Sequence, residues 1–440
     1  MSEPIGRAIA RIEASARILA LIKLANVGLT LIWGFAVTYV FVRVLPLREF
    51  QAFLLLVAFG NFTISAEFGL TSIIYARLRR HWLGVSDDGQ GRFRLEEMGV
   101  LFLFLGLLIL GGLAMLIGAL LAGGLDTTMP LLFILFFLSA CLNLPALLAK
   151  RALAAVDGNF LWEALDCLRR VMTIALLLMM LQGLDPRISV ALQLGVSVVV
   201  IGYAIALVHA RLGMSLRHWM AFRTGGGHVR AHYLGDIGAS AAFTLSEVIA
   251  YNAPYFTIAL ATQDARPMLL FDFFFKMSRA LSMSVRAAVE AALPRITRAF
   301  HAGESARLHQ LLMRALGVAV VFALAASALL LLLGQWLFAK LFDGRAAIDL
   351  VDLLLVDAAL LALTVICVSV YVQGALGRFA LLLKRSLPFV AGSLLSVPVA
   401  LLLAGRFDVA FLSLYTLTLL VVAVLHGLSL RALLRERVRA

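Results

Sequence analysis

Residues Pro267–Ile296 read PMLLFDFFFKMSRALSMSVRAAVEAALPRI, a stretch with the length and apolar content of a membrane-spanning helix. Five charged side chains nevertheless fall on one stripe of that helix, roughly 80° wide. They are Asp272, Lys276, Arg279, Arg286 and Glu290. Burying one basic group at bilayer depth costs at least about 2.5 kcal/mol. The stripe is therefore predicted to face a wet, anionic or paired environment rather than lipid.

The composition of the whole chain supports a polytopic membrane protein. Of its 440 residues, 62% are hydrophobic and only 14% are charged, whereas soluble domains carry about 25% charged residues. The first apolar run is long enough to span and remain in the membrane, so no cleavable signal peptide is expected. The three cysteines lie far apart with no metal-ligand spacing, and neither a metal nor another cofactor is expected.

About twelve segments are long enough to cross a bilayer as helices, at about 20 mostly apolar residues each. The sequence therefore predicts an all-α fold with about twelve transmembrane helices. The segments are 24–42, 51–75, 98–122, 129–149, 160–182, 188–210, 236–260, 268–292, 315–339, 350–373, 386–405 and 408–430.

The distribution of basic residues orients these segments. About 26 of the 38 Lys and Arg residues lie in the termini and alternate loops, against about seven in the intervening loops. By the positive-inside rule, both termini are predicted to be cytoplasmic. A missing or extra span would scramble this alternation.

The loop after the sixth span contains Gly225-Gly226-Gly227, a composition typical of a linker. The chain is therefore predicted to divide into a six-helix lobe at 1–224, a cytoplasmic linker at 225–235 and a second six-helix lobe at 236–440. Transporters built from two parallel halves carry their substrate path between the halves. The charged stripe and this division together favour a transporter.

The stripe on residues 267–296 has two possible roles. Asp272–Lys276 and Arg286–Glu290 are i,i+4 pairs that could neutralise each other. Arg279 then needs a partner, and Glu247, predicted at similar depth in the preceding span, is the candidate. The alternative is that the basic side chains contact an anionic substrate directly. Both roles require an aqueous or protein environment.

Two further charged sites lie in predicted spans. Glu67 lies in GNFTISAEFGL (Gly60–Leu70), and an ion pair with Arg77 or with the N-terminal arginines is favoured over a proton site. Asp166 can pair with Arg169 or Arg170 at i+3 or i+4. We interpret this second group, together with Glu163, as a self-neutralised cluster at the cytoplasmic interface.

No enzyme signature is present. The sequence contains no phosphate-binding glycine loop, zinc spacing or nucleophile elbow, and its loops are too short for a soluble catalytic or ATPase domain. The protein is expected not to be an enzyme.

Three stretches resemble the polysaccharide-biosynthesis or O-antigen flippase family, which shares a superfamily with multidrug/toxin extruders and lipid II flippases. They are AEFGLTSIIYARLRR (Ala66–Arg80), KRALAAVDGNFLWEALDCLRR (Lys150–Arg170) and FDFFFKMSRALSMSVRAAVEAALPRITRAFHAGESARL (Phe271–Leu308). The resemblance implies two six-helix lobes around a central V-shaped cavity. It also implies that basic residues hold a lipid diphosphate there, in the positions of Lys276, Arg279 and Arg286. Span seven of the family carries an acidic residue, whose position here is that of Glu247 or, alternatively, of Asn252.

The expected function is that of a bacterial inner-membrane flippase, which moves a polyprenyl-diphosphate-linked oligosaccharide to the periplasmic leaflet for O-antigen, lipopolysaccharide or other surface-polysaccharide assembly. Expected partners are this lipid substrate, membrane lipids and a polysaccharide polymerase or glycosyltransferase, but no nucleic acid. Glu247, Asp272, Glu290 and Glu67 are expected to pair or to couple ions. The alternatives are an ion-coupled small-molecule antiporter of the same superfamily and a non-transporting scaffold.

Overall fold

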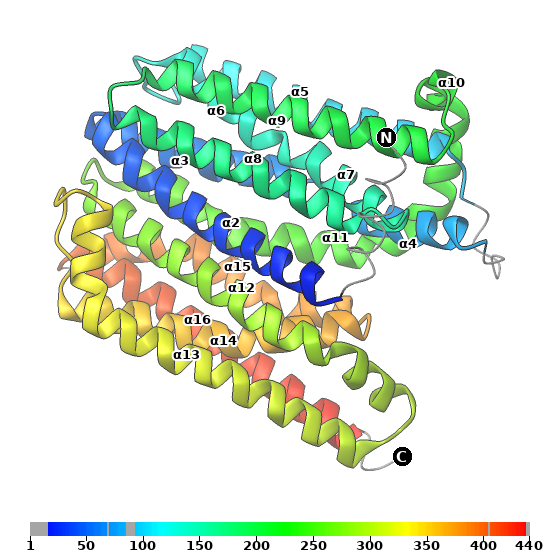
Figure 1. Cartoon of the computed structure of the whole chain (residues 1–440). Helices are drawn as coiled ribbons and strands as arrows, with labels where there is room; N and C mark the ends of the chain where they lie inside the picture. Colours follow the sequence, from blue (N-terminus) through cyan, green and yellow to red (C-terminus); the bar gives the residue numbers. More distant parts are fainter. Residues whose placement is uncertain (1–15, 68–69, 85–92, 404, 437–440) are drawn as a thin grey trace. The chain divides into compact units, whose positions relative to one another are not determined.

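A computed structural model describes residues 16–67, 70–84, 93–403 and 405–436 (Figure 1). Within these ranges the regular structure is helical, with no β-strand. Nine helical stretches of the described residues are long and apolar enough to cross a bilayer, and one of them (Pro130–Ala155) consists of two consecutive helices. The protein is a multi-pass all-α membrane protein, as the sequence predicts.

The chain folds as two compact units, an N-terminal unit (Met1–Ala241) and a C-terminal unit (Ala242–Ala440). The N-terminal unit contains α2 (Ala16–Val44), α3 (Leu47–Ser65), α4 (Leu70–Trp82), α5 (Glu96–Leu121), α6 (Pro130–Cys141), α7 (Asn143–Ala155), α8 (Asn159–Met180), α9 (Pro186–Arg211) and α10 (Leu216–Met220). Helix α11 (Phe222–Ala261) runs from the first unit into the second. The C-terminal unit continues with α12 (Arg266–His301), α13 (Ser305–Leu341), α14 (Leu350–Ala375), α15 (Phe379–Leu402) and α16 (Phe407–Glu436).

Each predicted span corresponds to a helix or to a pair of broken helices. Three predicted spans, which correspond to α8, α11 and α12, are less apolar or more charged than the nine stretches counted above. These three carry the intramembrane charges singled out from the sequence at Asp166, Glu247 and Asp272. The segment 225–235, expected as a linker, is helical and forms part of α11.

The prediction of one continuous helix over 51–75 is wrong. Helix α3 ends at Ser65, and Ala66 and Glu67 form a turn before α4 begins at Leu70. The Glu67 carboxylate accepts a hydrogen bond from the backbone N–H of Thr71 at 3.0 Å. The first amides of a helix have no intrahelical partner, so Glu67 caps α4, and this favours a break over a continuous helix.

A second break separates α6 from α7 at Leu142. Pro145 has no N–H to donate to the carbonyl four residues earlier, which kinks a helix. The Asn143 side chain donates instead to the Ala140 carbonyl at 2.9 Å. The break therefore holds a polar side chain inside the apolar N-terminal unit.

The turn between α7 and α8 is fixed by a carboxylate. Asp157 has a left-handed backbone (φ 58°), and its oxygens accept from Arg79 at 2.5 Å and Trp82 at 2.9 Å. Burial alone would raise the pKa of Asp157, but the hydrogen bonds from Arg79 and Trp82 hold this pKa below its usual value. The side chain is exposed, so the contact ties α4 to this turn at the rim of the unit.

In the C-terminal unit, the first turns of α12, α14 and α16 are joined by an ion-pair network, which we call the Arg266 network. Its members are Arg266, Asp349, Asp352, Arg406 and Asp408. Arg266 lies 2.8 Å from the fully buried Asp352 carboxylate. The hydrogen bond from Arg406 lowers the pKa of Asp349. The network thus fixes one end of three core helices.

Candidate functional site

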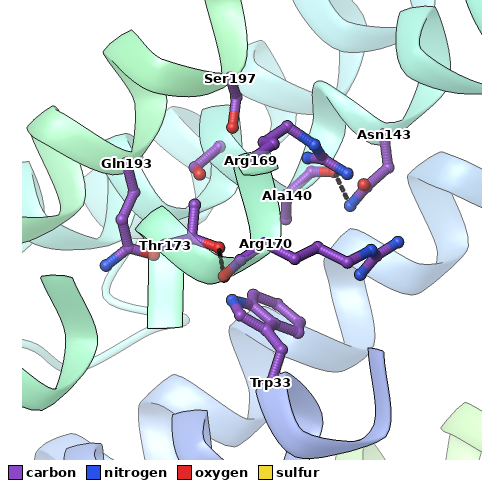
Figure 2. A pocket seen from close by; sticks show the side chains of 9 residues that line it. Trp33, Ala140, Asn143, Arg169, Arg170, Thr173, Gln193 and Ser197 are labelled. Atoms are coloured by element: carbon purple, nitrogen blue, oxygen red, sulfur yellow. Dashed lines mark hydrogen bonds between the residues drawn. The ribbon is translucent and has the colours of Figure 1, made fainter. Parts of the chain in front are cut away.

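A polar pocket opens inside the N-terminal unit (Figure 2). The space inside it that water-sized groups can occupy is about 40 Å³, and the pocket is open at its mouth. Helices α2, α6, α7, α8 and α9 contribute to its wall, and α8 packs against α2, α7 and α9. The lining residues are Trp33, Ser139, Ala140, Asn143, Arg169, Arg170, Thr173, Gln193 and Ser197.

The basic side chains of the pocket share one carboxylate. Arg169 donates to Oδ1 of Asp166 from Nε at 3.0 Å and from Nη2 at 2.6 Å. Arg170 donates to Oδ2 from Nε at 2.9 Å. Asp166 and Arg169 are buried, with 4% and 7% of their surface exposed. The i+3 and i+4 pairing predicted from the sequence is confirmed.

The neighbouring charges leave the pocket with an excess of positive charge. One turn before Asp166, the buried Glu163 accepts from Asn26 at 2.7 Å and lies 3.6 Å from the Lys150 ammonium. Lys150 thus balances Glu163, and Asp166 balances one of the two arginines. One guanidinium charge remains without a carboxylate among these described contacts.

The two arginines lie far from both ends of their helix. Arg169 and Arg170 are at the middle of α8 (Asn159–Met180), about 16 Å along the axis from either end at 1.5 Å per residue. The predicted position of the cluster at the cytoplasmic interface stays a prediction. Only Glu163, in the second turn, lies near the start of the helix.

Uncharged polar groups complete the wall. Gln193 and Ser197 are one turn apart on α9, and Gln193 donates from Nε2 to the Ser189 hydroxyl at 3.2 Å. The Thr173 hydroxyl donates to the Arg170 carbonyl at 3.0 Å. Figure 2 shows Gln193 and Asn143 on opposite sides of the two arginines, with the Trp33 indole beside Arg170. The pocket thus combines cations with hydroxyl and amide groups.

The stripe predicted on residues 267–296 lies on α12 in the C-terminal unit. Asp272 is 1% exposed and accepts from the Tyr255 hydroxyl at 2.8 Å and from the Lys276 ammonium. The Asp272–Lys276 pair predicted from the sequence is therefore present. Tyr255 was not singled out from the sequence, although a tyrosine on the preceding span is the kind of donor that a buried carboxylate requires.

The two arginines of the stripe are exposed and lie near aromatic rings. The Arg279 guanidinium is 5.6 Å from the Phe275 ring centroid, and that of Arg286 is 5.7 Å from the Tyr371 ring centroid. Aromatic faces attract cations. The Glu290 side chain lies outside the described residues, so its predicted pair with Arg286 stays a prediction.

Glu247 on α11 is half-buried in the C-terminal unit. Among the described side chains no ion pair joins it to Arg279, so that expected partnership is not present. Glu67 is half-buried at the break before α4. Arg77 instead pairs with Glu97 at 3.2 Å, and the extreme N-terminal arginines lie outside the described residues.

Metal binding finds no support in the described part of the chain, where no group of three His, Cys, Asp or Glu side chains is arranged to hold an ion. The pocket-lining residues that sequence reasoning missed are Trp33, Ser139, Ala140, Asn143, Thr173, Gln193 and Ser197. Only weak features of the sequence point to these residues. Gln193 and Ser197 share a face of an otherwise apolar helix, and Asn143 lies two residues before a helix-breaking Pro145.

Neither a protein-family model nor a curated protein sequence matches the chain. Solved structures do match. An inward-facing multidrug resistance MATE family transporter of the MOP superfamily has a TM-score of 0.63 and 14% identity, over 96% of this chain and 99% of that chain. The chain has the fold of a MATE transporter.

Two further structures agree with the fold. The Vibrio cholerae MATE transporter VcmN in its bent form has a TM-score of 0.55 and 16% identity, over 95% of this chain and 97% of that chain. A MATE in the straight conformation has a TM-score of 0.61 and 13% identity, over 98% and 97%. The predicted arrangement of twelve helices in two lobes fits the MATE fold.

Proposed function

We propose that the protein is a carrier, not an enzyme, which moves a polyprenyl-diphosphate-linked oligosaccharide from the cytoplasmic to the periplasmic leaflet of a bacterial inner membrane by alternating access. The observation that carries this proposal is the excess of cations on α12. Asp272 is occupied by Lys276 and Tyr255, and Arg279 and Arg286 extend the same stripe as exposed cations. Guanidinium groups bind phosphoryl oxygens bidentately.

The MATE fold also supports a second candidate, an antiporter of organic cations, because one matched structure is a multidrug resistance transporter. Such a ligand requires acidic side chains that are free to bind it. Asp166 and Asp272 already hold basic residues, which favours an anionic substrate and leaves Glu247 as the intramembrane acid that an organic cation would use. A polysaccharide polymerase or glycosyltransferase is the proposed source or receiver of the substrate.

The test is flipping of a labelled polyprenyl-diphosphate oligosaccharide in proteoliposomes. Wild type is compared with Arg279→Ala and with the double variant Lys276→Ala/Asp272→Asn, which leaves no unpaired acid. Arg314→Ala removes an exposed charge from α13 and is the matched control. We expect at least about tenfold slower transport in the first two variants, which corresponds to the loss of one charge-assisted hydrogen bond.

Transport at wild-type rate in both α12 variants would remove the stripe from the substrate path. If wild type moves no lipid but exchanges organic cations, the protein is an antiporter. If it does neither, a scaffold within a polysaccharide assembly complex becomes the better explanation.

A further inference from the structure

The pocket of the N-terminal unit contains an imbalance of charge that protein groups do not resolve. The guanidinium groups of the buried Arg169 and the half-buried Arg170 contact one carboxylate, and arginine does not lose its proton in proteins. A net charge in a low-dielectric interior costs several kcal/mol unless a counter-charge is present. The mid-helix depth of Arg169 and Arg170 places both far from either end of α8.

Hydrogen-bond donors of both arginines remain available. Asp166 accepts from Nε of Arg170, but the two terminal nitrogens of Arg170 make no hydrogen bond to any residue that the structure describes. Arg169 likewise keeps Nη1 after donating from Nε and Nη2. Each guanidinium thus presents donors toward a space lined by hydroxyl and amide groups (Figure 2).

We infer that this pocket binds a single oxyanion group, a phosphoryl or a carboxylate, between Arg169 and Arg170. An oxyanion supplies the missing negative charge and accepts from the free guanidinium nitrogens. The hydroxyls of Ser139 and Ser197 and the amides of Asn143 and Gln193 suit its remaining oxygens and any hydroxyls next to them. A cation does not fit, because the net charge of the pocket repels it.

The inference rests on the proposed function only for the source of the oxyanion. The diphosphate of the lipid and an acidic sugar of its glycan both carry the required group. Phosphoryl and carboxylate probes distinguish these two sources. The α12 stripe lies in the other unit, so variants of the pocket and of the stripe test different claims.

The experiment is a titration of the full-length protein, purified in detergent, with inorganic pyrophosphate, glucose 1-phosphate, glucuronate and neutral glucose. Binding is followed by calorimetry and by the fluorescence of Trp33, with Trp33→Phe as the baseline for the optical signal. We expect at least one anion to bind and glucose not to bind. Arg170→Gln should weaken anion binding about ten- to hundredfold, the loss of one hydrogen bond to a charged group.

The controls separate a specific site from a change in net charge. Arg187→Gln removes an exposed charge at the start of α9 in the same unit and should bind anions as wild type does. Arg170→Lys keeps the positive charge but loses the paired N–H donors of the guanidinium. Its affinity for anions should lie between those of wild type and Arg170→Gln. Because Arg170→Gln leaves Asp166 paired with Arg169, its thermal unfolding should resemble that of wild type.

Absence of binding by all three anions, or equal affinity in wild type and Arg170→Gln, would overturn the inference. Preference for pyrophosphate and glucose 1-phosphate would support it with the diphosphate as source, and preference for glucuronate would support it with an acidic sugar. If anions bind as expected but labelled lipid is not flipped, the proposed function fails alone. If lipid is flipped but Arg170→Gln binds anions normally, only the pocket assignment fails.

Discussion

The α8 pocket and the α12 stripe differ in how their intramembrane charges are neutralised. On α12, a single carboxylate holds one lysine and one tyrosine, and the arginines lie exposed beside aromatic rings. On α8, a single carboxylate holds two arginines inside a pocket built from five helices. Lysine can release its proton when buried, whereas arginine cannot. The charged group on α8, although it has fewer residues than the α12 stripe, therefore has the greater need for a counter-charge.

This difference shows that the number of charges in a span is a poor guide to the demand that they create. The α12 stripe contains more charged residues, but its buried acid, Asp272, is already bound by Lys276 and Tyr255. The α8 group looks self-neutralised at i+3 and i+4, and its imbalance emerges only when Glu163 is seen to be paired with Lys150.

The largest effect should come from removing the two carboxylates. Asp166→Asn leaves the buried Arg169 and the half-buried Arg170 without an acid, and we expect the free energy of unfolding to fall by about 3–5 kcal/mol. Asp272→Asn should cost less, about 1–3 kcal/mol, because Lys276 can become neutral. Equilibrium unfolding of both variants in detergent measures this contrast. Equal losses would contradict the distinction between the two sites.

The ion pairs at the rims of the two units should contribute unequally to the free energy of unfolding, the more buried pair contributing more. Arg266→Gln leaves the buried Asp352 without its cation and should lower the free energy of unfolding by about 2–3 kcal/mol. Arg79→Gln breaks a pair with the exposed Asp157 and should cost at most about 1 kcal/mol. Thermal unfolding tests the ranking, and a larger loss in Arg79→Gln would refute it.

Helix packing gives a smaller contrast between the units. A Cβ at Gly99 of α5 would lie 2.6 Å from the His218 backbone oxygen, whereas at Gly334 of α13 it would meet the Leu353 side chain, 2.7 Å away. Backbone cannot yield as a leucine can, so Gly99→Ala should cost about 1–3 kcal/mol, the usual cost of overpacking, and Gly334→Ala less. Gly106→Ala, with no atom within 4 Å, is the control on α5 and should stabilise by up to about 1 kcal/mol in the same unfolding assay, because alanine favours a helix more than glycine does.

The smallest effect should be the pH dependence of the two rim carboxylates. The pKa values of Asp157 and Asp349 are both lowered in the folded protein. Their stabilisation is therefore complete above the unfolded pKa of about 3.9 and is lost as the pH falls below it through the folded pKa. Asp157→Asn and Asp349→Asn should each reduce the slope of the melting temperature against pH below about pH 4. An unchanged slope in both variants would contradict these shifts.

The sequence predicts the helices well because each transmembrane helix makes its backbone hydrogen bonds within itself. A local run of apolar residues is therefore enough to indicate such a helix. The Asp272–Lys276 and Asp166–Arg169 pairs were predictable for the same reason, since their partners lie one turn apart. The break at Glu67 was not predicted, because the apolar residues on both sides continue a helical pattern across it.

The N-terminal pocket could not be predicted because its lining comes from helices far apart in the sequence. Trp33 and Ser197 belong to the first and sixth predicted spans, and nothing local indicates that both line one pocket with Arg170. Tyr255, the second partner of Asp272, is hidden in the same way. Residues assembled by tertiary packing have no signature in a sequence window, whereas pairs one turn apart do.

The low apolar content of α8 and α12 has a consequence for how the chain enters the membrane during synthesis. An arginine or lysine at the middle of a helix opposes insertion by about 2.5–3.5 kcal/mol on the translocon scale. Both helices pack against their successors, α8 on α9 and α12 on α13, and these successors are strongly apolar. We therefore expect each pair to insert as a hairpin, so that a nascent chain ending at Met180 leaves α8 outside the bilayer until α9 emerges from the ribosome.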